Sequence, residues 1–102
     1  MDIEAFVRRL GEAKASAILR TDVADAASPA MEAAVRGGFR IVEFTLTIPG
    51  VLERIAEFSR RAELVVGAGT VLTVEEARAA VEHGARFLVS PVVDEEVIEE
   101  AR

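Results

Sequence analysis

The sequence predicts an α/β fold in which four strand–helix units follow one another, as they do in a (β/α)8 TIM barrel. Short apolar runs alternate with longer segments of helical period, and turn residues, glycine above all, separate the two kinds of segment. The apolar runs contain few polar residues, which is typical of parallel strands that are buried on both faces. At 102 residues, 51% of them hydrophobic, the chain has the size and the apolar content of one domain.

Residues 1–13 are expected to form a leading helix ahead of the strand–helix units. Charged residues interrupt its apolar pattern, so the segment resembles neither a signal peptide nor a membrane span, and we interpret the protein as cytoplasmic. The apolar residues have helical spacing and stop before a glycine that should end the helix: Ile3, Phe6, Val7 and Leu10, followed by Gly11.

The first unit begins with an apolar run at residues 15–19, which predicts a short buried strand. The sequence allows two possible first residues for the helix that follows. Ser28 can cap it, which places Pro29 in the first turn, where proline is tolerated. Alternatively, the helix begins at Asp22, and Pro29 then has to kink it. In either case Gly37 should end it.

Three further units follow in the same order. Thr73 and Glu76 have the spacing of a capping box at the start of the third helix, and Asp94 can cap the fourth. Between the third strand and its helix, residues 67–70 read Gly-Ala-Gly-Thr and indicate a turn. We expect strands at 39–46, 64–66 and 87–89, and helices at 49–62, 73–83 and 95–102.

The short, apolar strands favour a barrel over an open sheet. Four units alone would leave two unpaired strand edges and an inner face without partners, which is an aggregation hazard. We therefore interpret residues 1–102 as the N-terminal half of a barrel, with the four units in residues 15–102. The alternative is a half-barrel whose exposed edges pair with those of a second copy.

The composition argues against two classes of function. The 18 acidic and 12 basic residues give a net charge of −6, so the surface lacks the general positive charge that attracts nucleic acid. There is no cysteine, and His83 is the only histidine, so we expect neither a disulfide nor a metal site. His83 stands at a predicted helix end, and we assign it no catalytic role.

Polar residues stand at the ends of the predicted strands, where TIM barrels hold their active sites. Glu43 is the most informative of them, because it interrupts an apolar strand, and a buried carboxyl group has a raised pKa that suits a general acid or base. The alternative is that Glu43 pairs with Arg20 or faces solvent at the strand end. The residues at these positions are Arg20, Glu43, Thr45, Thr47, Thr70 and Ser90.

Arg20 and the Gly-Ala-Gly-Thr segment offer a way to bind an anion. Arg20 can hold a carboxylate or phosphate through two hydrogen bonds, although a surface ion pair is the more usual role of an arginine. The glycines can let the backbone approach a ligand, with the hydroxyl group of Thr70 or nearby amides facing an anion. The alternative is a simple tight turn. The segment lacks the third glycine of a dinucleotide-binding fingerprint.

Four sequence blocks, in this order and spacing, resemble the 2-keto-3-deoxy-6-phosphogluconate and 4-hydroxy-2-oxoglutarate aldolases over residues 15–102. The combination of a glycine pair, a strand glutamate, Gly-Ala-Gly-Thr-Val and Val-Ser-Pro is specific. The blocks are Ala17-Ile18-Leu19-Arg20, residues 37–49 (from Gly37-Gly38 to Pro49), residues 66–71 and residues 84–91.

The resemblance implies the N-terminal half of a class I aldolase. Such an enzyme cleaves a 2-keto-3-deoxy sugar acid phosphate to pyruvate and glyceraldehyde 3-phosphate through a lysine imine, without a metal or another cofactor. The partners that the resemblance implies are a small keto-acid substrate and further copies of the chain in a homotrimer. Neither nucleic acid nor a membrane is an expected partner.

The resemblance also implies roles for individual residues. Glu43 matches the glutamate that moves protons, Thr70 the threonine that helps to bind the pyruvyl carboxylate, and Arg20 a substrate-binding arginine. Thr47 stands where many relatives have arginine and others have threonine. The expected substrate-binding residues are Arg20, Thr45, Thr47, Thr70, Ser90 and Pro91.

The sequence departs from the family in one respect that matters for the chemistry. Relatives carry the imine lysine on the sixth strand, which has no counterpart in residues 1–102. Lys14 is the only lysine here and lies ahead of the first strand. We therefore expect the parent protein to be the aldolase and this chain, cut from it, to be inactive alone. Two other hypotheses are a self-assembling half-barrel and a small domain that binds keto acids through Arg20, Glu43 and Thr70 without cleaving them.

Overall fold

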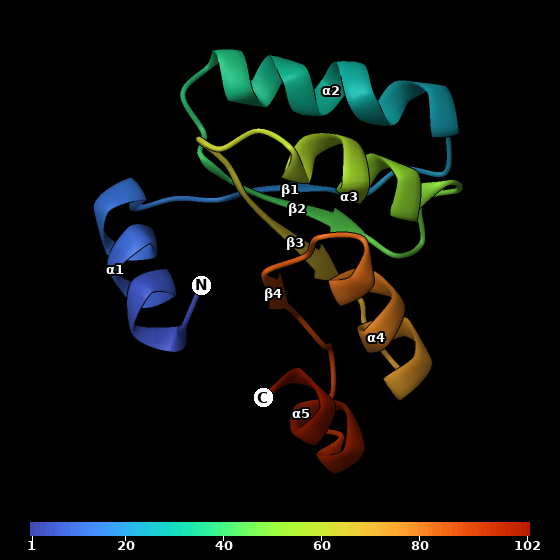
Figure 1. Ribbon diagram of the computed structural model, residues 1–102. Helices are drawn as coiled ribbons and strands as arrows, with labels where there is room; N and C mark the ends of the chain where they lie inside the picture. The colour runs from blue at the N-terminus through green and yellow to red at the C-terminus, as the bar shows by residue number, and fades with distance from the viewer.

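The computed structural model describes every residue from 1 to 102 and contains four parallel strands and five helices (Figure 1). The strands pair in the order of the sequence, β1-β2-β3-β4, and a helix follows each of them. Four consecutive βα units of a TIM barrel have this arrangement, so the predicted fold class is confirmed. The elements are α1 (Ile3–Ala13), β1 (Ala17–Leu19), α2 (Ala24–Arg36), β2 (Ile41–Thr45), α3 (Val51–Ser59), β3 (Val65–Gly69), α4 (Val74–Glu82), β4 (Phe87–Leu88) and α5 (Glu95–Ala101).

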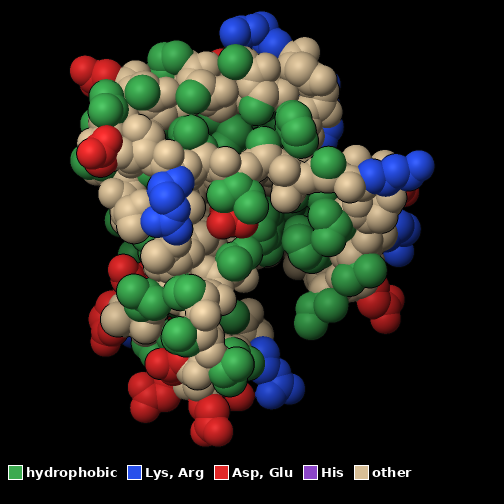
Figure 2. All heavy atoms as spheres, turned by 180° about the vertical axis from the view of Figure 1, so that it is seen from behind, with side chains coloured by type: hydrophobic (Ala, Val, Ile, Leu, Met, Phe, Trp, Pro, Cys, Tyr) green, Lys and Arg blue, Asp and Glu red, His purple; other side chains and the backbone are tan.

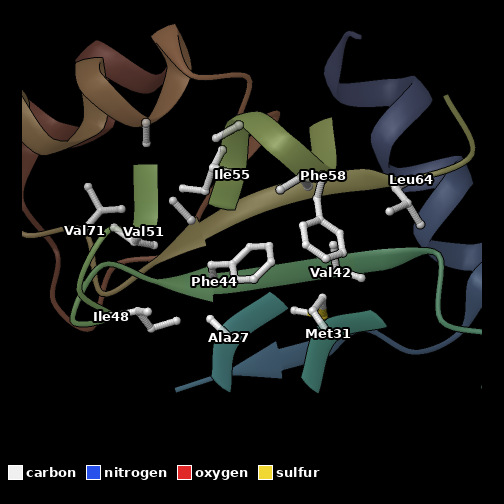
Figure 3. Close-up of a cluster of buried hydrophobic side chains, with 14 of the residues drawn as sticks. Ala27, Met31, Val42, Phe44, Ile48, Val51, Ile55, Phe58, Leu64 and Val71 are labelled. Carbon is white, nitrogen blue, oxygen red and sulfur yellow. The ribbon is translucent and has the colours of Figure 1, made fainter. Parts of the chain in front are cut away.

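The main core lies between one face of the sheet, here called the outer face, and helices α2, α3 and α4 (Figure 3). Alternate residues of β2 and β3 point into this core, among them Val42, Phe44 and Val66. The ring of Phe44 packs against Phe58 of α3, with the two centroids 5.2 Å apart. Burial of one such large apolar side chain contributes about 1.5–3 kcal/mol, so this layer holds the helices on the sheet.

The opposite face of the sheet, here called the inner face, carries the other alternate residues. In the strand register Glu43 of β2 lies beside Ile18 of β1 and Gly67 of β3. Helix α1 covers the end of this face at which the strands begin, because Phe6 stacks on Phe87 with 5.1 Å between the ring centroids (Figure 1). Exposure on this face is greatest at the edge strand: Ile18 of β1 is 64% exposed, whereas Glu43 and Thr45 of β2 are 5% and 2% exposed.

Helix α1 does not end at Gly11 as predicted. It continues to Ala13 and ends at Lys14, which has a φ of 66° and donates its backbone N–H to the carbonyl of Leu10 at 2.8 Å. A glycine inside a helix costs only about 1 kcal/mol relative to alanine, and the stacking of Phe6 on the sheet helps to offset that cost. Gly11 is therefore tolerated within the helix.

Helix α2 begins between the two predicted starts. Its N-cap is Val23, which makes no side-chain capping bond, so the predictions of Asp22 and Ser28 as caps are wrong. Pro29 lies inside the helix, as the second alternative required. It is exposed, so the carbonyl group that proline leaves without an intrahelical partner lies near the surface, where water can satisfy it.

The glycines of residues 67–69 belong to β3, so the prediction of a turn at these positions is wrong. Each pairs with a residue of β2: Gly67 with Glu43, and Gly69 with Thr45. Two glycines between apolar residues usually indicate a turn. Here the parallel pairing with β2 keeps the backbone extended up to Gly69. Thr70 is the first residue after the strand.

The two predicted helix caps are confirmed. Thr73 and Glu76 form a complete capping box, and Asp94 accepts hydrogen bonds from the backbone N–H groups of Glu96 and Val97. The strands are shorter than predicted at β1, β2 and β4, because the flanking residues lie outside the paired segments. None of the five helices is long and apolar enough to cross a lipid bilayer.

Candidate active site

Three of the predicted site residues meet where the first three strands end. Arg20 follows β1, Glu43 lies in β2, and Thr70 follows β3, so parallel pairing brings them to one edge of the sheet. Arg20 Nη2 donates a hydrogen bond to Thr70 Oγ1 at 2.8 Å. The guanidinium group also lies close enough to Glu43 for its charge to act on the carboxyl group.

Glu43 is buried in the inner face, with 5% of its surface exposed. Its carboxyl group forms neither a hydrogen bond nor an ion pair with another group of the chain, so the alternative of an ion pair with Arg20 is wrong. The carboxyl oxygen atoms keep some contact with solvent, because Arg54 Nε is the only fully buried side-chain nitrogen or oxygen atom that lacks a hydrogen-bond partner. Burial raises the pKa of Glu43, and the positive charge of Arg20 opposes part of that rise. A carboxyl group in this state can hold a proton and release it at moderate pH.

Thr70 has a strained backbone conformation, and its side-chain hydroxyl group is bonded to Arg20. Its φ is 59°, in the left-handed region, which a β-branched residue rarely adopts. Such a conformation costs on the order of 1–3 kcal/mol and is concentrated at functional sites. The hydroxyl group accepts the hydrogen bond from Arg20, so its own proton remains available to a ligand.

The two threonines of β2 and its following loop form a second polar pair. Thr45 shares the inner face with Glu43 and is 2% exposed, whereas Thr47 is exposed. Their Oγ1 atoms lie 2.9 Å apart, within hydrogen-bond distance. The pair extends the site along β2 beyond Glu43.

Ser90 and Pro91 lie in the loop after β4, at the same edge of the sheet. The loops after β3 and β4 are joined by a hydrogen bond from the N–H of Val71 to the carbonyl of Val89 at 3.1 Å. Ser90 Oγ accepts a hydrogen bond from Val92 within its own loop, at 3.4 Å. Ser90 and Pro91 therefore share this edge with the other predicted site residues, but no hydrogen bond links them to those residues.

Lys14 and His83 lie apart from this edge. Lys14 caps α1 ahead of β1, at the end of the sheet where the strands begin, and the side chain is exposed. His83 caps α4, and its Nδ1 lies 2.7 Å from the carbonyl oxygen of Ala79, in keeping with the role at a helix end. No group of three or more His, Cys, Asp or Glu side chains is arranged to hold a metal ion.

Two glycines that shape the site were not predicted as site residues. A Cβ atom on Gly67 would collide with the ring of Phe87, and one on Gly69 would collide with the side chain of Glu43. The signal was present in the sequence, because glycines two apart on a strand face the same side. The prediction of a turn at residues 67–70 concealed it.

The inner face borders a hollow that is lined by both hydrophobic and charged side chains and flanked by α1 and α5 (Figure 2). The largest cavity, about 800 Å³, lies there between Phe6, Phe87 and Ala101. None of the predicted site residues lines it. The candidate site is therefore an open surface at the strand ends and not an enclosed pocket.

Comparisons with known proteins lead to one family. The family model "KDPG and KHG aldolase" matches residues 6–102. A 2-dehydro-3-deoxy-phosphogluconate aldolase of Zymomonas mobilis is 46% identical over 70 residues, which make up 69% of this chain and 33% of that protein. A KHG/KDPG aldolase of Escherichia coli is 36% identical over 76 residues, 74% of this chain and 36% of that protein.

A solved structure agrees with these relatives. It is the KDPG aldolase from Legionella pneumophila with pyruvate captured at low pH as a covalent carbinolamine intermediate. The match has a TM-score of 0.73 at 28% identity and covers 83% of this chain and 42% of that one. The chain spans about a third of the length of the curated relatives that it matches.

Proposed function

Because the chain belongs to the KDPG and KHG aldolase family, we propose that it provides the proton-transfer carboxyl group and part of the substrate site of a class I aldolase. The observation that carries the proposal is Glu43, a residue of strand β2 that is only 5% exposed and whose carboxyl group has no hydrogen-bond or ion-pair partner in the chain. A group with no hydrogen bond or ion pair to satisfy it contributes little to the stability of the fold, and burying it is costly. Such a cost is characteristic of catalytic acids and bases.

The proposed reaction breaks the C3–C4 bond of 2-keto-3-deoxy-6-phosphogluconate or 4-hydroxy-2-oxoglutarate after C2 has formed an imine with a lysine. Ionised Glu43 removes the proton of the C4 hydroxyl group, C4 leaves as an aldehyde, and the bonding electrons move toward the iminium nitrogen. Protonated Glu43 then returns its proton to C3 of the enamine, and water hydrolyses the imine to release pyruvate. The raised pKa of Glu43 suits a group that both takes and returns a proton.

Arg20 and Thr70 are proposed to bind the carboxylate of the keto acid. The guanidinium group has five N–H donors, and the bond to Thr70 leaves most of them for a bidentate contact with a carboxylate. The hydroxyl proton of Thr70 can add one further hydrogen bond. No metal or other cofactor is required, because the imine nitrogen accepts the electrons. Contacts with the rest of the substrate are proposed for Thr45, Thr47, Ser90 and Pro91.

The imine lysine is proposed to come from a part of the barrel outside these residues. Lys14, the only lysine, lies at the opposite end of the sheet from Glu43. The covalent carbinolamine of pyruvate in the Legionella relative supports an amine-based mechanism for the family. For the whole protein we further propose a cytoplasmic homotrimer, with small keto acids as substrates.

The test joins this chain to the lysine-bearing C-terminal part of the Zymomonas relative and measures the release of pyruvate. The proposal predicts saturable release from 2-keto-3-deoxy-6-phosphogluconate or 4-hydroxy-2-oxoglutarate by the joined protein and none by either part alone. The matched control replaces the imine lysine by methionine. A joined protein that folds but releases no pyruvate from either substrate would contradict the proposal.

One observation favours a second candidate function, a half-barrel that self-associates. Ile18 on the inner face is 64% exposed, and the strands of a second copy would cover it. Light scattering of the 102-residue chain separates the candidates. A stable dimer that has no affinity for the lysine-bearing half would favour self-association over the aldolase role.

A further inference from the structure

We infer that Gly69 is a positioning residue for Glu43. Because Gly69 has no side chain, there is space beside it for the Glu43 carboxyl group. Both residues face inward on neighbouring strands, near the ends at which the site residues gather. A Cβ atom on Gly69 would lie 2.9 Å from Cδ and 3.4 Å from Cγ of Glu43, and closer still to Oε2. Carbon atoms pack best about 3.5–4.0 Å apart, so even an alanine would force Glu43 to move.

The requirement at Gly69 is for space and not for an unusual backbone conformation. Positive φ values occur at two non-glycine residues and three glycines, and Gly69 is not among them. An alanine could therefore adopt its backbone conformation. A glycine inside a strand weakens that strand, so its presence in β3 marks a close approach by another group. Here that group is the Glu43 carboxyl.

Gly67 provides a matched case on the same strand and the same face. A Cβ atom on Gly67 would meet ring atoms of Phe87, so this glycine makes room for the aromatic ring on which α1 packs. The two glycines of β3 therefore serve different neighbours: Gly67 admits Phe87, and Gly69 admits Glu43. This difference allows the two effects to be separated by experiment.

A side chain at position 69 has a defined electrostatic consequence. Pushed away from the sheet, the Glu43 carboxyl group loses burial, and pushed toward Arg20, it gains attraction from a positive charge. Both displacements lower the pKa of Glu43, because burial raises it and Arg20 lowers it. The catalytic consequence rests on the proposed function: a displaced carboxyl group reacts more slowly, since about 1 Å of misplacement can cost on the order of 10²-fold in rate.

The first experiment follows the titration of the Glu43 side-chain carboxyl carbon by NMR in the 102-residue chain. In Gly69→Ala the apparent pKa of Glu43 should fall toward the ordinary value of a glutamate. Gly67→Ala, the strand-matched control, should disturb Phe87 and leave the Glu43 titration close to that of the unchanged chain. Gly11→Ala, which meets no atom within 4 Å, should leave both unchanged.

A double-mutant cycle on the free energy of unfolding covers the case in which Gly69→Ala does not fold. Glu43→Ala removes the obstructing carboxyl group, so Glu43→Ala/Gly69→Ala should be about as stable as Glu43→Ala. An unchanged Glu43 titration in Gly69→Ala, or a double variant as disrupted as Gly69→Ala, would overturn the inference whatever the protein catalyses. Failure of the proposed function would instead appear as absent pyruvate release in the joined protein, with the titration difference still in place.

Discussion

Arg20 Nη2 donates a hydrogen bond to Thr70 Oγ1 at 2.8 Å across 50 positions of sequence. The bond joins the residues that follow β1 and β3, the two strands on either side of β2, which carries Glu43. It brings a positive charge and a hydroxyl donor to the same edge as a buried acid. We propose that these groups bind the carboxylate of a keto acid and transfer protons during its cleavage.

The first prediction concerns the hydroxyl group of Thr70 in the barrel completed with a lysine-bearing half. Thr70→Val keeps the β-branched shape, and with it the backbone strain at φ 59°, but removes the hydroxyl group. KM should rise roughly tenfold or more, since a hydrogen bond to a charged group is worth about 1.5–3 kcal/mol, while kcat changes far less. Thr70→Ser keeps the hydroxyl group and should restore KM. A fall in kcat at constant KM would point to a role in the chemical step instead.

The second prediction concerns the pH dependence of stability. Burial raises the pKa of Glu43 above its ordinary value of 4.5, so the folded chain binds this proton more tightly than the unfolded chain. The stability contributed by protonated Glu43 is therefore complete below about pH 4.5 and is lost as the pH rises through the raised pKa. In urea titrations Glu43→Gln should match the unchanged chain near pH 4 and exceed its stability at pH 7. A variant less stable at pH 7 would show that the carboxylate stabilises the fold.

The third prediction concerns the capping box of α4. Thr73→Ala removes the side-chain oxygen that accepts the N–H of Glu76, and this should lower the free energy of unfolding by about 1 kcal/mol. Thr73→Ser keeps the oxygen and should retain most of that stability. Denaturation with urea provides the measurement. Equal losses in the two variants would mean that the methyl group and not the hydrogen bond matters.

The local features of the fold could be predicted from the sequence. The order of the four units follows from alternating apolar runs and helical periods, and the caps at Thr73 and Asp94 depend on residues only two or three positions apart. The first residue of α2 could not be predicted in the same way. Val23 caps α2 without a side-chain bond, so the start of that helix is set by packing against the sheet and not by a local signal.

The candidate site could be predicted as a set of residues but not as an arrangement. Position at a strand end identified Arg20, Glu43 and Thr70, because parallel strands end at a common edge. That Arg20 bonds to Thr70 and leaves Glu43 unpaired depends on contacts between strands, which no spacing within one strand reveals. The space provided by Gly69 is likewise visible only once β2 and β3 are paired.

The fourth prediction concerns Lys14. In the 102-residue chain, borohydride reduction in the presence of pyruvate should leave Lys14 unmodified, because this exposed residue lies at the opposite end of the sheet from the site. Mass spectrometry of the reduced protein provides the readout, and the joined protein with its imine lysine is the positive control. Stoichiometric adduct on Lys14 would mean that the chain carries its own imine lysine.

The last prediction tests the central claim, that Glu43 moves the protons of the aldol cleavage. Glu43→Gln keeps the size and hydrogen-bonding capacity of the side chain and removes the titrating group. In the joined protein, the rate of pyruvate release at saturating substrate should fall by about 10²- to 10⁴-fold, the usual contribution of a positioned acid or base, with little change in substrate binding. Near-full kcat in Glu43→Gln, together with reduced thermal stability, would contradict the claim and make Glu43 a structural residue.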